Sequence, residues 1–386
     1  MDSLDLPKGG QGPPAPDNKD SKLTLKQNFG FIRGTSLVIG SVIGALTYAE
    51  LNSVVSKSGL TYAYLHDCYG RLPAFLFLWT SATVIVPSMI AISGLAFADY
   101  LLTLAPVCGP RPELIVKLCA VAMIVTLMVI NCKSNDVAAP VQVICTILKI
   151  LALLVIVFGG IIRMAQGWTA ELRQGFDNST KESVNIALAF YSINYSYAGW
   201  SNVFTIFEEV KNPKRNLLAC SGVGILVVTV LYIMANISFL TVLSRKEMMT
   251  SSAVAVDWAD VVLGSASITM LLAIAVSTFG AAASSLFTGS RIIFAAGRDN
   301  VMPEWLSFLH VNNLSPVPAI LFTGILAIIF VIPGGIGNII NFLMFPMNIL
   351  DFLSTTVLFV FRKTKPNAPR IIKNEDDAFK ISDIFA

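Results

Sequence analysis

The chain has 386 residues, of which 55% are hydrophobic and 13% are charged, and its net charge is +3. Soluble domains carry roughly 25% charged residues, so an ordinary soluble protein is excluded. The long charge-poor stretches are instead typical of a polytopic helical membrane protein, whose first partner is the lipid bilayer. No basic or acidic block is long enough to suggest nucleic acid as a partner.

The amino-terminal region changes character at about residue 29. Residues 1–28 are rich in proline, glycine and charge and contain no apolar run of the signal-peptide type, so we expect a disordered cytosolic tail. The next stretch, 31–51, contains IGSVIGALTYAEL and meets Glu50 after barely three turns of apolar helix. It is too short to cross a bilayer, which needs about 20 residues.

Longer apolar stretches follow and predict the membrane spans. They run over 72–105, 114–131, 138–163, 184–207, 217–243, 261–289, 315–332 and 336–361. Their lengths suit a bilayer core, with tilting where they exceed it. We therefore expect an all-α polytopic membrane protein whose transmembrane domain covers 29–361 and whose residues 362–386 form a second cytosolic tail.

The connections between these stretches predict the orientation of the chain. We expect the amino terminus to lie in the cytosol, together with the short basic connections at 208–216, 290–300 and 361–370. We expect the opposite side of the membrane for the connections at 106–113, 164–183 and 244–260, although two of these also carry basic residues. The distribution of basic residues therefore favours this orientation, although some basic residues also occur in the connections expected outside.

Two of the apolar segments contain enough small and polar residues to interrupt a helix. The first is GTSLVIGSVIG (34–44), and the second is FYSINYSYAGWSNVF (190–204). Inside a bilayer, backbone leaves the helix only where protein or a water-filled cavity satisfies its polar groups. Paired broken helices are a sequence sign of a transporter site, and unwound N–H and C=O groups suit a zwitterionic amino acid. The alternative is that small residues let helices pack closely.

Lys149 lies within the apolar stretch ICTILKILALL. Intramembrane charges are costly and usually have a partner inside the bundle. The alternative is that the lysine extends its ammonium to the cytosolic surface.

No motif for catalysis or metal binding is apparent. The sequence has no nucleophile elbow, phosphate loop or convergent carboxylate pair. Its two histidines lie far apart, and its six cysteines lack zinc-ligand or redox spacing. We expect neither an enzyme nor a metal or other cofactor.

Several ordered motifs resemble the light subunits of the heteromeric, L-type amino acid transporters of the amino acid–polyamine–organocation superfamily. The matching elements span residues 29 to about 345 and include AELNSVVSKSGLTYAYLHDCYG, NCKSNDVAAPVQVICTILKI, ALAFYSINYSYAGWSNVFTIFEEVKNPKRNL and STFGAAASSLFTGSRIIFAAGRDNVMP. The resemblance implies a LeuT-like bundle of inverted repeats at the plasma membrane. It also implies sodium-independent amino acid exchange by alternating access, together with a single-span glycoprotein heavy subunit linked through Cys108.

The resemblance also implies roles for individual residues. Lys149 matches a fixed cation that stands where sodium-coupled relatives bind an ion, and Tyr195 matches an aromatic gate over the substrate. Ala198 stands where a cationic-substrate relative carries aspartate, which predicts neutral substrates, with aromatic and cystine-type amino acids as candidates. The substrate site is completed by Val42, Ile43, Gly44, Gly199 and Ser201.

The chain also departs from the family pattern at both ends. After Gly44, some three dozen residues typical of relatives are missing, and the carboxylate-binding Ser-Gly donors with them. We expect the spliced segment to be re-entrant; the alternative is that it crosses and places the amino terminus outside. The family's last two helices are also missing, and Asp351 is left in an apolar run without an evident partner. The bundle is thus predicted to be incomplete at both ends, and the alternative function is a transport-inactive isoform that only assembles with the heavy subunit.

Overall fold

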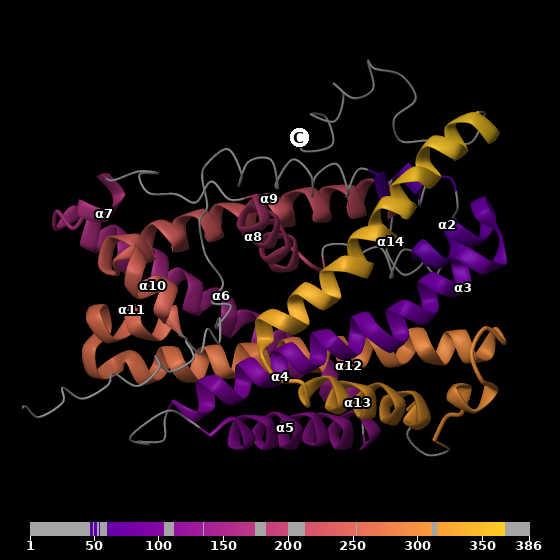
Figure 1. Ribbon diagram of the computed structural model, residues 1–386, viewed down its shortest axis with the longest axis horizontal. Coiled ribbons are helices and arrows are strands. Elements are labelled where there is room, and N and C mark those ends of the chain that lie inside the picture. The colour runs from indigo at the N-terminus through magenta and orange to yellow at the C-terminus, as the bar shows by residue number, and fades with distance from the viewer. Residues whose placement is uncertain are drawn as a thin grey trace, which may run out of the picture.

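A computed structural model describes residues 47–48, 50–51, 54, 60–103, 112–133, 135–173, 183–199, 213–251, 253–310 and 315–366. All regular structure in these ranges is helical (Figure 1). The elements are α2 (Leu60–Tyr69), α3 (Arg71–Thr80), η1 (Ser81–Ile85), α4 (Val86–Leu102), α5 (Glu113–Lys133), α6 (Asn135–Ala165), α7 (Ala170–Arg173), α8 (Ser183–Ser196), α9 (Pro213–Val242), α10 (Arg245–Thr250), α11 (Val254–Leu263), η3 (Gly264–Ala266), α12 (Ser267–Arg298), η4 (Glu304–Ser307), α13 (Val317–Val331) and α14 (Ile336–Thr364).

The predicted membrane spans correspond closely to these helices. Six helices of the described residues are long and apolar enough to cross a membrane: Arg71–Leu102, Glu113–Lys133, Val143–Ala165, Gly222–Val242, Val254–Arg298 and Ile336–Thr364. The stretch predicted at 315–332 is the shorter apolar helix α13. The prediction of an all-α polytopic bundle is therefore confirmed. The stretch predicted at 184–207 differs, because α8 ends at Ser196.

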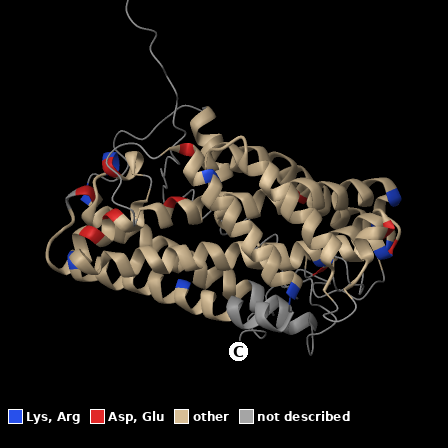
Figure 2. Cartoon of the chain, turned by 90° about the horizontal axis from the view of Figure 1, so that it is seen from below, with Lys and Arg blue, Asp and Glu red and all other residues tan. Residues whose placement is uncertain are grey.

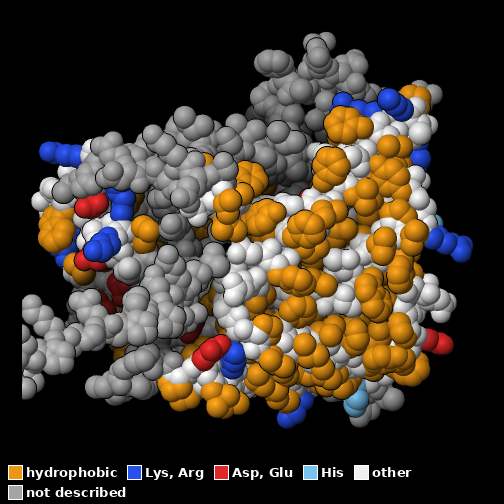
Figure 3. All heavy atoms as spheres, viewed as in Figure 1, with side chains coloured by type: hydrophobic (Ala, Val, Ile, Leu, Met, Phe, Trp, Pro, Cys, Tyr) orange, Lys and Arg blue, Asp and Glu red, His pale blue; other side chains and the backbone are white. Residues whose placement is uncertain are grey.

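The outer surface of the bundle has the polarity that a bilayer requires. Figure 2 shows most lysines, arginines and acidic residues at the two ends of the long axis. Figure 3 shows hydrophobic side chains gathered over α4, α5, α13 and α14. Several large apolar side chains of α6 are also exposed, among them Ile144, Leu151 and Phe158. Such a surface is stable in lipid, whereas water would disfavour it.

The interior is centred on α4, which packs against α5, α12, α13 and α14. Ile90 and Leu95 of α4 belong to the largest buried cluster, with Ile124 of α5, Leu286 of α12 and Leu343 of α14. The α3–α4 helix is continuous through the π-helical turn η1, which comes just before Pro87. A π turn there accommodates a residue that has no backbone N–H to donate.

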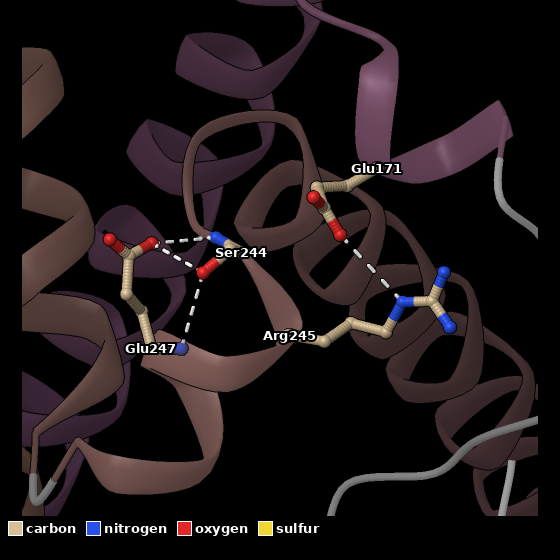
Figure 4. Close-up of polar contacts among 4 residues, drawn as sticks. All are labelled: Glu171, Ser244, Arg245 and Glu247. Carbon is tan, nitrogen blue, oxygen red and sulfur yellow. Dashed lines mark hydrogen bonds and ion pairs between the residues drawn. The ribbon is translucent and has the colours of Figure 1, made fainter. Parts of the chain in front are cut away.

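Two loops that are predicted to lie outside occur at the same end of the molecule (Figure 4). The Arg245 Nε lies 3.7 Å from a Glu171 carboxylate oxygen, which joins the connections 164–183 and 244–260. Ser244 and Glu247 form a capping box at the start of α10. Glu247 accepts hydrogen bonds from the Ser244 N–H and hydroxyl, both at 2.8 Å, and these lower the pKa of Glu247. The predicted alternation of connections agrees with this contact.

The predicted tail 1–28 and the re-entrant character of 31–51 lie largely outside the described residues. Within 31–51, Thr47, Tyr48, Glu50 and Leu51 are helical and buried. The tail predicted at 362–386 is described as far as residue 366, and its first residues continue α14.

Candidate functional site

The helix α8 ends where the sequence predicts a break. Its last helical residue is Ser196, and a turn follows over 197–199. The Tyr197 N–H donates to the Asn194 carbonyl at 3.2 Å and to the Ile193 carbonyl at 3.3 Å, and the Ala198 N–H donates to the Tyr195 carbonyl at 3.0 Å. Such i→i−3 bonds tighten the last turn of a helix. The end of α8 at Ser196 agrees with the predicted interruption within 190–204, whose residues 200–204 lie outside the described residues.

Gly199 gives the chain its exit direction from this turn. Its φ of +99° lies in the left-handed region that favours glycine. Glycine adopts this conformation without steric cost, so the chain can turn away from the helix axis after the last turn. The chain therefore leaves the helix at a place that the sequence predicts to be inside the bilayer.

Helix α9 supplies one set of partners for this end. The Tyr232 hydroxyl donates to the Ser196 carbonyl at 3.2 Å. The Tyr197 hydroxyl donates to Thr229 Oγ1 at 3.1 Å, and the Tyr197 and Tyr232 rings pack edge to face with centroids 5.6 Å apart. These contacts fix the turn against α9 through side chains and not through regular helix packing.

Helix α14 holds the opposite side of the same turn. The Asn194 Nδ2 donates to Asn348 Oδ1 at 2.6 Å, and the Asn348 Nδ2 donates to the Met344 carbonyl at 2.7 Å. Pro346 lies within α14, two residues before Asn348. Because proline cannot donate to the helix ladder, α14 is locally weakened where it contacts α8.

Tyr195, the predicted aromatic gate, turns toward the interior. Its ring packs against the large buried cluster of α4, α5, α12, α13 and α14. Ala198 is partly buried and Gly199 is exposed, and both lie in the turn after Ser196. The structure thus brings together three of the predicted substrate-site residues, Tyr195, Ala198 and Gly199, at the end of one helix.

A polar flank runs along α14 from this site. Steps of three, four and seven residues place Asn348, Asp351, Thr355 and Arg362 on the same flank of the helix. It adjoins the buried stripe that contains Leu350, Ser354 and Val357. Along its length, α14 packs against α8, α4 and α2. The flank therefore connects the end of α8 with the region around α2.

The far end of the flank binds the helical segment that contains Tyr48 and Glu50. The Arg362 Nη2 and Nε donate to the two Glu50 carboxylate oxygens at 2.8 and 3.2 Å. The Thr61 hydroxyl donates to the Tyr48 hydroxyl at 3.1 Å, and Tyr48 also packs edge to face on Tyr64. Leu353 of α14 packs against the buried cluster that contains Tyr48. Asp351 thus lies on α14 between Asn348, which contacts α8, and Leu353, which packs near Tyr48.

The remaining predicted residues are placed differently. Lys149 lies on α6 with its side chain exposed, and neither a hydrogen bond nor an ion pair joins its ammonium to any described residue. Its bridging role stays a prediction. Among the described residues, no group of three His, Cys, Asp or Glu side chains is placed to hold a metal ion. Five other predicted site residues lie outside the described residues: Val42, Ile43, Gly44, Cys108 and Ser201.

Sequence reasoning missed the polar contacts of α14. It identified Asp351 as a costly acid, but it did not identify Asn348 or the pairing of Glu50 with Arg362. The available signal was two polar residues, Asn348 and Asp351, one turn apart within an apolar stretch. Polar side chains at that spacing inside a membrane usually face the protein interior.

Comparisons with known proteins agree with these features. The amino acid permease family matches residues 34–384. The b(0,+)-type amino acid transporter 1 of Homo sapiens is 38% identical over 339 residues, which cover 86% of this chain and 68% of that protein. The large neutral amino acids transporter small subunit 2 of Homo sapiens is 37% identical over 337 residues (86% and 63%). The cystine/glutamate transporter of Pongo abelii is 30% identical over 399 residues (95% and 79%).

Proposed function

The chain belongs to the amino acid permease family, and from that premise we propose that it exchanges neutral amino acids across the plasma membrane without sodium, by alternating access. The family assignment makes the protein an amino acid transporter and not an enzyme, as predicted. The mode of exchange, the substrate class and the partner belong to the proposal. The observation that carries it is the end of α8 at Ser196, where the Ser196 carbonyl accepts a hydrogen bond from Tyr232 of α9 and the Asn194 side chain donates one to Asn348 of α14.

A carboxyl-terminal helix end of this kind can bind the ammonium of a zwitterion through its main chain. It presents carbonyl groups, which favour an ammonium. Tyr195 would close over the substrate from the interior side, since its ring already packs against the buried cluster. Val42, Ile43 and Gly44 would contribute the amine-binding carbonyls of the first segment, and Ser201 would line the second.

The substrate class follows from the turn after Ser196. Ala198 offers no carboxylate for a basic side chain. The charged side chain of lysine or arginine would therefore lose its hydration on binding without gaining an ion-pair partner, which is unfavourable. Neutral substrates avoid that penalty. The names of the relatives span b(0,+)-type, large neutral and cystine/glutamate transport, so leucine, tyrosine and cystine are the substrates to test.

The proposed assembly includes a single-span heavy subunit. Cys108 would form the intermolecular disulfide, since its predicted loop faces the oxidising side of the membrane. Lys149 would act as a fixed cation in place of a bound sodium ion. For this role, the exposed Lys149 ammonium would have to gain a hydrogen-bond acceptor in the complex.

Counterflow measured in proteoliposomes tests the proposal. Vesicles that contain the full chain with its heavy subunit, preloaded with unlabelled leucine, are expected to accumulate external radiolabelled leucine well above empty vesicles. The accumulation should be equal in sodium and in potassium buffers, and unlabelled tyrosine should compete. A disulfide-linked complex without counterflow would contradict exchange and leave the assembly-only alternative. A strict requirement for sodium would contradict the proposed mechanism.

A further inference from the structure

We propose that Asn348 of α14 is a positioning residue for substrate binding, which acts through Asn194 on the turn that contains Tyr195. The inference rests on the proposed function and adds to it a residue on another helix that does not itself touch the substrate. Two observations carry it: a directed chain of hydrogen bonds from α8 into α14, and the place of Asn194 in the last turn of α8.

The direction of the hydrogen-bond chain follows from its last acceptor. The Met344 carbonyl can only accept a hydrogen bond, so the Asn348 amide must turn its nitrogen toward Met344, at 2.7 Å. The Asn348 oxygen is then placed to accept from Asn194 Nδ2, at 2.6 Å. Both asparagine side chains are partly buried, where polar groups are costly unless they are hydrogen-bonded. The pair therefore joins α8 to α14 at one defined point.

Asn194 transmits this contact to the turn. While its side chain donates to α14, its carbonyl accepts from the Tyr197 N–H at 3.2 Å. Tyr195, the proposed gate, is the next residue, and its ring packs against the large buried cluster. A shift of Asn194 would therefore move both the Tyr195 ring and the main-chain groups of the turn.

Helix α9 contacts the turn at other points. The Tyr232 hydroxyl donates to the Ser196 carbonyl, and the Tyr197 hydroxyl donates to Thr229. These contacts begin two residues after Asn194, so they fix the later part of the turn. The contact with Asn348 fixes its beginning, on the side of Tyr195.

The part of α14 that carries Asn348 is itself anchored. Beyond Asn348, the Tyr69 hydroxyl of α2 donates to Thr356 Oγ1 at 2.9 Å, and the Arg362 guanidinium binds Glu50. A binding site loses affinity when its supporting groups are free to move, because ordering them on binding costs free energy. Loss of the Asn348 contact should therefore appear as weaker binding of the substrate.

Asn348→Leu tests the proposal, because it puts an apolar side chain of similar size in place of the amide. In the counterflow assay with the heavy subunit, the KM for leucine should rise about fivefold, whereas the maximal rate should change by less than about twofold. In the same purified complex without substrate, the Tyr197 and Ala198 amides should exchange with deuterium faster than in the natural chain.

Asn194→Leu removes the same hydrogen bond from the α8 side and should give the same changes, so the test stands if one of the two variants folds poorly. The double variant should have a KM no higher than that of either single variant, because the two side chains act as one unit. A KM that rises by the product of the two single effects would overturn the proposal.

Asn131→Leu is the matched control for a merely structural effect. Asn131 of α5 also donates to the carbonyl four residues before it, that of Leu127, at 2.9 Å. This variant should lose thermal stability without a change in the leucine KM or in the exchange of amides 197–198. A normal leucine KM in Asn348→Leu, or an equal rise in Asn131→Leu, would overturn the inference while leucine exchange by the natural chain still stood. If the natural chain exchanges no leucine, the proposed function fails, and unchanged amide exchange in Asn348→Leu would separately show that Asn348 does not hold the turn.

Discussion

Arg362→Ala is expected to lower the free energy of unfolding by about 3 kcal/mol, because it leaves the buried Glu50 carboxylate without its guanidinium. Only 3% of the Glu50 side chain is exposed, whereas Arg362 is 49% exposed. If the pair is lost, water can therefore solvate the arginine side chain, whereas it cannot solvate the buried glutamate carboxylate. Two guanidinium nitrogens bind the two carboxylate oxygens, and such bidentate pairs are among the strongest hydrogen-bonded contacts of arginine.

The measurement is thermal unfolding of the purified full chain in one detergent. A matched control is Lys365→Ala, which removes an exposed pair with Asp67 at 3.8 Å. Exposed pairs contribute less than about 1 kcal/mol, so the control should shift the midpoint little. The double variant with Glu50→Leu and Arg362→Met should recover most of the lost stability, because both charges are gone. Equal midpoints for Arg362→Ala and Lys365→Ala would show that the Glu50 pair does not stabilise the bundle.

Gly160→Val is expected to disrupt the packing of α6 against α9. A Cβ at Gly160 would lie 2.6 Å from the Cα of Ser238, and it would also overlap the Ser238 side chain. Because the obstruction includes backbone, a rotamer change cannot relieve it, and the two helices must move apart. The movement would also break the 2.6 Å hydrogen bond from Ser238 Oγ to the Ile156 carbonyl. Overpacking of this kind costs about 3 kcal/mol.

Gly224→Val is the matched control, since Gly224 lies on α9 and nothing stands within 4 Å of its added Cβ. Small residues at an interface let membrane helices approach closely, whereas a lipid-facing glycine has no such task. The same thermal measurement should show a large loss for Gly160→Val and little change for Gly224→Val. Similar losses in both variants would mean that helix propensity, and not the close approach, decides the result.

The sequence predicted the spans because their signal is local. Runs of apolar residues between polar connections mark membrane helices without knowledge of what they pack against. The break in 190–204 was predicted for the same reason, because serines, asparagines and Gly199 occur together in a short segment. The physical cause that the structure adds is long-range: α8 ends where Tyr232 of α9 and Asn348 of α14 provide other partners.

The polar contacts of the site could not be predicted, since they join residues far apart in the chain. Glu50 and Arg362 are separated by 312 positions, and Asn194 and Asn348 by 154. Nothing in either local sequence specifies its partner. Asp351 was identified because a charge in an apolar run is conspicuous, yet its surroundings depend on the packing of α14 against α8 and α2.

The most direct test of a substrate site at the end of α8 is hydrogen–deuterium exchange of the amides at 195–199, measured with and without leucine. Without substrate, these amides should exchange readily, because they lie at a helix end where the Tyr197 and Ala198 N–H groups make i→i−3 bonds of 3.2 and 3.0 Å. Saturating leucine should slow their exchange and leave the α10 turn at 245–250 unchanged. Unaltered exchange at 195–199, under conditions in which leucine binds the protein, would contradict the account.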